Sequence, residues 1–84
     1  MNNDDLLVKR VWFDKERIFV ELSDGRIVGS PLEWFPRLQR ATIEERNQYE
    51  LISGGYGIHW EQLDEDLLAT GFLMYSKKLA KVNG

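Results

Sequence analysis

The segment VWFDKERIFVELSDGRIV, residues 11–28, decides the fold of this chain because it holds two turn signals between strand-like runs. Residues 7–13 and 18–22 are rich in β-branched and aromatic side chains, which favour strands, and the polar residues 14–17 between them suit a hairpin loop. Asp24-Gly25 then favours a two-residue turn, because both central residues of such a turn need positive φ. The segment therefore predicts a three-stranded antiparallel meander.

Tight turns at these two places fix which side chains share a face of the meander. On one face the predicted register groups six apolar residues: Val11, Phe13, Ile18, Val20, Leu22 and Ile27. In that register Leu22 lies opposite Ile27, and Trp12 pairs with Phe19 on the other face. A face that presents two aromatic rings is expected to be covered by a helix or by another protein.

Two short helices are predicted after the meander. The string SPLE, residues 30–33, is a helix-start pattern in which Ser30 is the N-cap, and Pro36 should break this helix after one turn. Residues 42–45, TIEE, repeat the capping box. A second helix should therefore run from there to about Tyr49.

The last third of the chain predicts one more strand and one more helix. The glycines of residues 54–57 permit a loop that leads into a short fourth strand at residues 58–60. Asp64 is expected to cap a helix that ends near Gly71. Residues 76–84 carry little apolar pattern and are expected to fray.

These signals together predict a small single α+β domain over residues 1–84, with an ordered core of about residues 6–75. We expect an antiparallel meander of three to four strands with two to three short helices on one face. Four residues join the six meander side chains in the expected core: Phe35, Leu38, Trp60 and Leu67.

Composition narrows the class of protein and its location. The 84 residues contain no cysteine, so neither a disulfide framework nor a thiolate metal site is possible. The N-terminus lacks the basic and long apolar regions of a signal peptide. The longest uncharged run, residues 67–76, is far shorter than the roughly 20 apolar residues that span a bilayer. We therefore expect a cytoplasmic protein that is not bound to a membrane.

His59 is the only histidine, so a nucleophile–base pair or a zinc site would have to be built around it. Glu61 lies two residues away on the same strand face, and Asp64 would have to approach in space. This spacing matches no ligand motif, and a domain of this size offers little concavity for catalysis. We expect a structural, hydrogen-bonded role for His59, and no catalytic residue, metal ligand or cofactor. A small enzyme or metal site around it is the least favoured alternative.

Two charged groups are candidate binding surfaces. The acidic residues Glu61, Asp64, Glu65 and Asp66 would suit a basic protein partner. Together with Trp12 and Phe19, they form the partner-binding surface that we expect. Three arginines would instead serve a nucleic-acid-binding regulatory protein: Arg37, Arg40 and Arg46. Nucleic-acid binding is the weaker hypothesis, because the formal net charge of −3 opposes contact with phosphate.

Several strings along the chain resemble one bacterial family. They are DGR at 24–26, WFPRL at 34–38, GIHW at 57–60 and LDED at 63–66. This combination resembles the domain of unknown function 2442 family, over about residues 8–73. The resemblance implies a compact α+β fold and no established reaction.

The resemblance also implies a partner. Members of this family are often encoded beside a gene for the domain of unknown function 4160, and such pairs resemble toxin–antitoxin modules. The expected function is therefore a non-enzymatic protein-binding module, antitoxin-like, that binds the neighbouring gene product or a second copy of itself.

Overall fold

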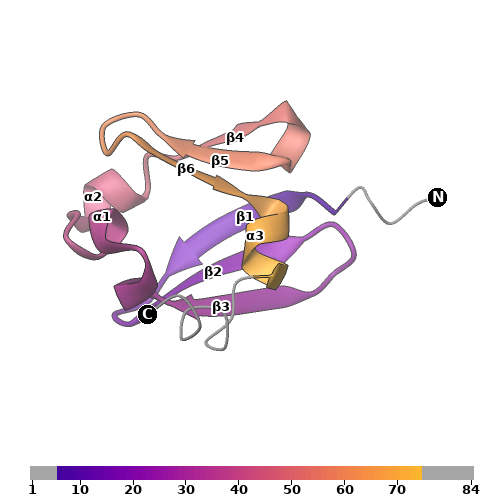
Figure 1. Cartoon of the computed structure of the whole chain (residues 1–84), viewed down its shortest axis with the longest axis horizontal. Coiled ribbons are helices and arrows are strands. Elements are labelled where there is room, and N and C mark those ends of the chain that lie inside the picture. Colours follow the sequence, from indigo (N-terminus) through magenta and orange to yellow (C-terminus); the bar gives the residue numbers. More distant parts are fainter. Residues whose placement is uncertain (1–5, 75–84) are drawn as a thin grey trace.

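The structure, a computed structural model, describes residues 6–74 of the chain. Its strands form two three-stranded antiparallel sheets (Figure 1). Sheet A has the order β1 (Val8–Phe13), β2 (Arg17–Leu22) and β3 (Ile27–Pro31). Sheet B has the order β4 (Glu50–Ile52), β5 (Gly57–Trp60) and β6 (Glu65–Leu68).

Short helical segments connect and end these sheets. The connection from sheet A to sheet B contains η2 (Leu32–Trp34), α1 (Pro36–Gln39) and α2 (Ile43–Arg46). The turn η3 (Ser53–Gly55) joins β4 to β5, and α3 (Ala69–Met74) follows β6. The predicted α+β class with antiparallel strands and short helices is confirmed, and the described strands are divided between two sheets. The expectation about residues 76–84 lies outside the described residues.

The first hairpin has the predicted register, with Phe13 opposite Ile18. A bulge between Val8 and Arg10 shifts the pairing by one residue near the start of β1. Because of this shift, Val8 and Val11 both face the core and are buried, although they lie three residues apart. Simple alternation along the strand did not place Val8 in the core.

The second hairpin has a three-residue turn, and the predicted two-residue turn is wrong. The Leu22 N–H donates to the Arg26 carbonyl at 2.8 Å, and the Gly25 N–H donates to the Leu22 carbonyl at 2.9 Å. Gly25 has φ +97°, whereas Asp24 does not have positive φ. This geometry is a type I turn followed by a glycine bulge, which accepts Asp-Gly as readily as the two-residue turn does.

The longer turn moves the register of β3 by one residue. Ile27 lies opposite Glu21 and is 57% exposed, so its prediction as a core residue is wrong. Val28 lies opposite Val20 and packs against the core in its place. A slip of one residue exchanges the two faces of a strand, because side chains alternate with a period of two.

The predicted helix start at Ser30 is wrong as well. Ser30 lies in β3 opposite Ile18 and is buried, and the strand continues to Pro31. The Leu32 N–H donates to the Glu16 carbonyl at 2.8 Å, which extends the pairing beyond the strand. Pairing with β2 holds the backbone of Ser30 in an extended conformation, so Ser30 cannot cap a helix. The helical turn η2 begins at Leu32, without a side-chain cap.

The next two predictions about helices are confirmed in part. The residue before Pro36 has φ −128° and ψ 79°, so the helical turn is broken there as expected. The capping box is complete, because the Thr42 hydroxyl accepts the Glu45 N–H at 3.0 Å and the Glu45 carboxylate accepts the Thr42 N–H at 2.9 Å. Helix α2 nevertheless ends at Arg46 and does not reach Tyr49.

Asp64 does not begin a helix, which corrects the third helix prediction. It has φ +54° and lies in the turn between β5 and β6, a conformation that aspartate tolerates better than most residues. The following residues form β6, in which Leu67 pairs with Ile58 of β5. Helix α3 begins only at Ala69. Pairing of residues 65–68 with β5 therefore outweighs the local N-cap signal of Asp64.

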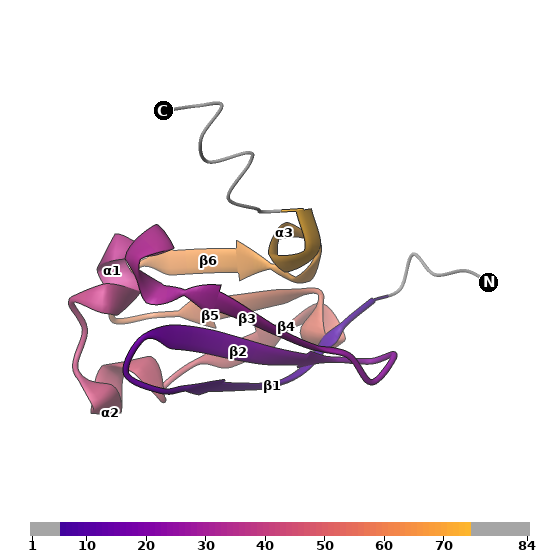
Figure 2. The same cartoon turned by 90° about the horizontal axis from the view of Figure 1, so that it is seen from below.

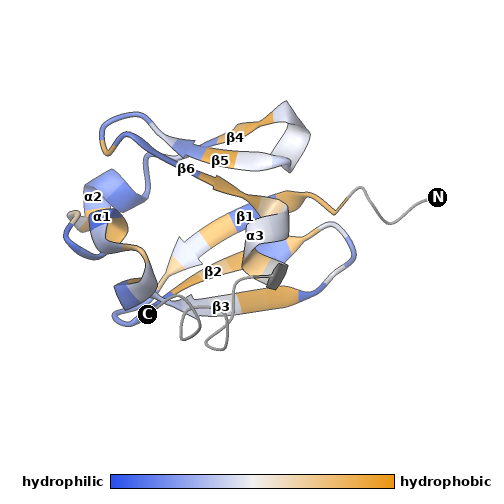
Figure 3. Ribbon diagram, in the orientation of Figure 1, coloured by the Kyte–Doolittle hydropathy of each residue, from blue (hydrophilic) through white to orange (hydrophobic). Residues whose placement is uncertain are grey.

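One hydrophobic core lies between the inner faces of the two sheets and α3. Its buried members are Val8, Val11, Ile18, Val20, Leu22, Leu32, Leu38, Ile58, Trp60, Ala69 and Phe72. Three predicted core residues are partly buried against it: Phe13, Phe35 and Leu67. In Figure 3 the hydrophobic segments lie on the strands of both sheets, whereas α2 and the turn between β5 and β6 are mostly hydrophilic. Within residues 6–74, no helix has the length and apolar character to cross a membrane.

Candidate functional site

The outer face of sheet A carries the aromatic pair that the sequence predicted. Trp12 lies opposite Phe19, and their rings are stacked with centroids 5.7 Å apart and 14° between the planes. The guanidinium carbon of Arg10 lies 4.6 Å from the centroid of the Trp12 ring. Arg10 Nε also contacts Glu21 Oε1 at 2.8 Å. The Trp12 ring is therefore in contact with both Phe19 and Arg10.

Gly29 completes this aromatic surface on β3. It lies opposite Phe19, and a β-carbon at residue 29 would be 2.8 Å from Phe19 Cε1. The phenyl ring therefore lies over the backbone of β3, in space that any other residue would fill. The result is a flat aromatic surface that spans all three strands of sheet A.

A hollow of about 360 Å³ adjoins Trp12 at the end of the first hairpin. Phe13 and Lys15 line it on the side of sheet A, and Ile43 and Arg46 line it on the side of α2. Ile43 is 73% exposed, which is unusual for an isoleucine. Ile43 was not among the predicted binding residues, although an isoleucine among charged residues at a helix start indicates an exposed apolar side chain.

Trp12 and Phe19 are half-buried on the outer face of sheet A, and the remaining part of each side chain is exposed to solvent. In Figure 2 the strands of sheet A lie nearest the viewer, with sheet B behind them, and no element of residues 6–74 covers them. The charged side chains that point outward from the strands are Arg10, Arg17 and Glu21. Asp14 lies beside the hollow, and its carboxylate accepts the backbone N–H groups of Glu16 and Arg17, which lowers its pKa and keeps it ionised. Charges of both signs therefore border the aromatic pair: Arg10, Arg17 and Lys15 are cations, and Glu21 and Asp14 are anions.

His59 lies on the outer face of sheet B, between two carboxylates. Its Nε2 contacts Glu61 Oε1 at 2.8 Å, and its Nδ1 contacts Asp66 Oδ1 at 2.5 Å. These hydrogen bonds raise the pKa of His59 to about 9, so the ring is protonated at neutral pH and donates from both nitrogens. Within residues 6–74, no group of three or more histidine, aspartate or glutamate side chains is arranged to hold a metal ion.

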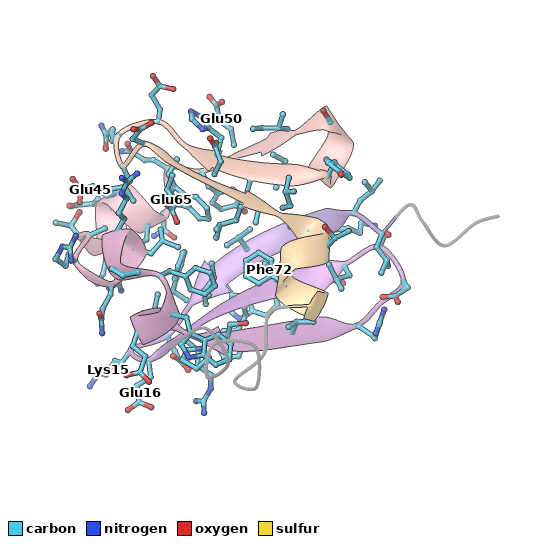
Figure 4. All side chains as sticks on the ribbon, in the orientation of Figure 1. Lys15, Glu16, Glu45, Glu50, Glu65 and Phe72 are labelled. Atoms are coloured by element: carbon cyan, nitrogen blue, oxygen red, sulfur yellow. The ribbon has the colours of Figure 1, made fainter. Side chains whose placement is uncertain are left out.

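The other two residues of the predicted acidic cluster contact Arg37. Arg37 Nη1 donates to the backbone carbonyl of Asp64, and it lies 4.0 Å from Asp64 Oδ2 and 3.8 Å from Glu65 Oε1. Glu65 points inward beside α1 (Figure 4), and burial raises the pKa of its carboxyl group. The cluster is therefore divided and partly neutralised within the domain.

The predicted partner-binding residues are not brought together. Trp12 and Phe19 alternate with core residues of sheet A, whereas Glu61 and Asp66 contact His59 on the outer face of sheet B. Because the inner faces of both sheets share one core, these two groups lie on opposite sides of the domain.

The three predicted arginines do not form one basic patch either. Arg46 donates to the carbonyls of Leu38 at 2.8 Å and Gln39 at 2.9 Å, and so it satisfies the end of α1. Arg37 is held against the turn between β5 and β6. Arg40 is exposed, and its side chain makes no hydrogen bond or ion pair with the described residues.

The fold and these surfaces define a small α+β domain with two sheets and a half-buried aromatic pair on the outer face of one of them. A family model described as Protein of unknown function (DUF2442) matches residues 8–78, and the chain belongs to this family. The resemblance drawn from the sequence is thereby confirmed.

A solved structure is similar over most of the chain. It is a protein of unknown function from Rhodospirillum rubrum, 26% identical, with a TM-score of 0.69. The similarity covers 88% of this chain and 95% of that one. A comparison with curated proteins gave no match.

Proposed function

We propose that this chain is a non-enzymatic protein-binding module whose partner docks on the outer face of sheet A. The observation that carries the proposal is the stacked pair of Trp12 and Phe19, which lies half-buried on the outer face of sheet A. Tryptophan and arginine are enriched among the residues that dominate binding energy at protein interfaces. Arg10, stacked on Trp12, adds such a residue to the aromatic pair.

The shape of the surface supports a protein ligand. The hollow between Trp12 and Ile43 is large enough for one apolar anchor side chain of a partner. Trp12 and Phe19 are already half-buried, so a partner would remove only the remaining area of the two side chains from water, at about 25 cal/mol per Å² of apolar surface. A partner that covers both rings and fills the hollow would therefore gain several kcal/mol before the cost of association.

The charge around the rings indicates the chemistry of the partner. Arg17 lies beside Gly29 and Lys15 lines the hollow, whereas Arg10 already contacts Glu21, so a partner whose carboxylates reach Arg17 and Lys15 around an apolar anchor fits best. We propose that this partner is the neighbouring gene product of the domain of unknown function 4160 type, that the pair is of the toxin–antitoxin type with this chain as the antitoxin-like member, and that it acts in the cytoplasm.

Co-expression tests this proposal. The tagged chain is expressed with the neighbouring gene product, and the complex is measured by sizing chromatography. Trp12→Ala should weaken the complex at least about tenfold, which corresponds to about 1.4 kcal/mol, because it removes the anchor ring. Tyr56→Ala is the matched control, since Tyr56 is an exposed aromatic residue outside sheet A. Equal effects of the two variants, a wild-type chain that forms only dimers with itself, or a chain that binds nothing would contradict the proposal.

One observation favours a second candidate, binding of single-stranded nucleic acid. Aromatic rings flanked by arginines can stack bases and contact phosphates, and Trp12, Phe19 and Arg10 have this arrangement. The net charge of −3 opposes it. A labelled oligonucleotide that binds the wild-type chain with strong salt dependence, and not the Trp12→Ala variant, would support this candidate over the protein partner.

A further inference from the structure

Among the strands of residues 6–74, β4 is an edge strand of sheet B. It pairs there with β5 on one side only, and all three of its residues are exposed. Edge strands are commonly protected by lysine, proline or a covering element, because their free N–H and C=O groups can pair with another chain. β4 has no such residue, and it carries Leu51 and Ile52, the latter 42% exposed.

An apolar row continues from this edge across the outer face of sheet B. Ile52 and Leu68 both pair with Gly57, and a β-carbon at residue 57 would meet Leu68 Cδ2 at 3.6 Å and Ile52 Cβ at 3.9 Å. Ile52 and Leu68 therefore flank the glycine on its two sides. Leu68 is 49% exposed, and so the row is open to solvent.

A row of charged residues lies beside the apolar one. Glu50, His59 and Asp66 are in register across the three strands. His59 Nδ1 contacts Asp66 and its Nε2 contacts Glu61, whereas the Glu50 carboxylate makes no hydrogen bond or ion pair with the described residues. Figure 4 shows Glu50 on the part of sheet B that lies away from sheet A. Its carboxylate is thus available to a cation at the open edge.

We propose that β4 accepts an extended segment of a protein as an additional antiparallel strand of sheet B. Sheet B is antiparallel throughout, so an added strand runs opposite to β4. From its N-terminus, this segment has an apolar residue opposite Ile52, an apolar residue opposite Leu51 and a lysine or arginine opposite Glu50. Backbone pairing supplies affinity, and the alternating neighbours supply specificity. This site lies on the opposite side of the domain from the Trp12 surface and does not depend on it.

Charge complementarity argues against a second copy of this chain as the occupant. If two β4 strands paired antiparallel about Leu51, Glu50 of each copy would lie beside Ile52 of the other. That arrangement leaves both Glu50 carboxylates without a cation and places each beside an apolar side chain. A segment with the order apolar, apolar, basic satisfies all three positions.

Labelled peptides test the proposal on the full chain. The probe is a fluorescein-labelled peptide, Thr-Val-Val-Lys-Thr, with blocked ends, and its binding is measured by fluorescence anisotropy. Two controls have altered order or charge: Thr-Lys-Val-Val-Thr and Thr-Val-Val-Glu-Thr. We expect the first peptide to bind at least about tenfold more tightly than either control, a difference of about 1.4 kcal/mol. Equal binding of all three, preference for the reversed order, or no binding would overturn the proposal.

Variants of the chain make the assignment specific to β4. Ile52→Ser should weaken binding of the first peptide at least about tenfold, whereas Ile27→Ser, at an exposed isoleucine on β3, should leave it unchanged. Glu50→Lys should reverse the preference toward the peptide that carries glutamate. Sedimentation of the chain alone completes the test: a dimer that Ile52→Ser dissociates would assign β4 to a second copy and overturn the proposal.

Discussion

Gly29 lies directly opposite Phe19 in sheet A, and the phenyl ring fills the space that a β-carbon of residue 29 would take. The same ring is stacked on Trp12. Phe19 can therefore lie over β3 and keep its contact with Trp12 only while residue 29 has no side chain. The proposed docking surface thus depends on Gly29, which has no side chain to contact a partner.

Substitution of Gly29 tests this dependence. Gly29→Ala should displace the phenyl ring and lower the free energy of unfolding by about 1–2 kcal/mol, as overpacking does elsewhere. The near-ultraviolet circular dichroism of the tryptophans should change with it. Gly71→Ala is the control, because no atom lies within 4 Å of a β-carbon there and alanine favours the helix by about 1 kcal/mol. The explanation is wrong if the two variants have the same stability.

The register of β3 gives a second prediction. Val28→Thr should destabilise the chain by about 1–2 kcal/mol, because it places a hydroxyl against the core. Ile27→Thr should change the unfolding free energy by less than about 0.5 kcal/mol, since that side chain is mostly exposed. Chemical denaturation of both variants measures the difference. If Ile27→Thr destabilised the chain more than Val28→Thr, the two-residue turn and its register would be correct instead.

The contrast between the two hairpins shows what local sequence can determine. The polar residues 14–17 end both strands of the first hairpin clearly, and the predicted pairs Val11–Val20 and Trp12–Phe19 are found. Asp24-Gly25 marks the second turn equally clearly, but a two-residue and a three-residue turn both accept this dipeptide. The three-residue turn is favoured because it lets Val28 pack on the core, whose other residues are distant in sequence.

The structural role of Arg46 gives a third prediction. Arg46→Met keeps much of the aliphatic stem but removes the two hydrogen bonds to the end of α1, and should cost about 1–2 kcal/mol of unfolding free energy. Arg40→Met removes the same charge from an exposed position and should cost less than about 0.5 kcal/mol. Thermal or chemical unfolding of the pair measures this. Equal costs would mean that the backbone contacts of Arg46 contribute little.

The carboxylates around His59 give a prediction about pH. The pKa of His59 is raised in the folded chain from 6.5 to about 9, so protonation favours the folded state. This contribution is complete below about pH 6.5 and is lost as pH rises through about 9. The melting temperature should therefore fall between about pH 7 and about pH 9, and His59→Gln should remove most of this slope. An unchanged slope in the variant would show that other groups cause it.

The candidate sites were less predictable than the strands. Alternation along β1 and β2 was sufficient to pair Trp12 with Phe19. The division of the acidic residues was not predictable, because it depends on Arg37, which reaches Asp64 from a helix 27 residues earlier in the chain. The same kind of distant pairing, between β5 and β6, replaced the helix expected after Asp64. Local signals for caps and turns contain no information about such neighbours.

The most direct test of the proposed docking surface uses the indole N–H signals of the three tryptophans in a ¹H–¹⁵N spectrum. On titration with the neighbouring gene product, the Trp12 signal should shift or broaden. The Trp60 signal should stay in place, because Trp60 is buried and its Nε1 donates to the Arg46 carbonyl at 2.9 Å. A stable complex that leaves the Trp12 signal unchanged would contradict docking on sheet A.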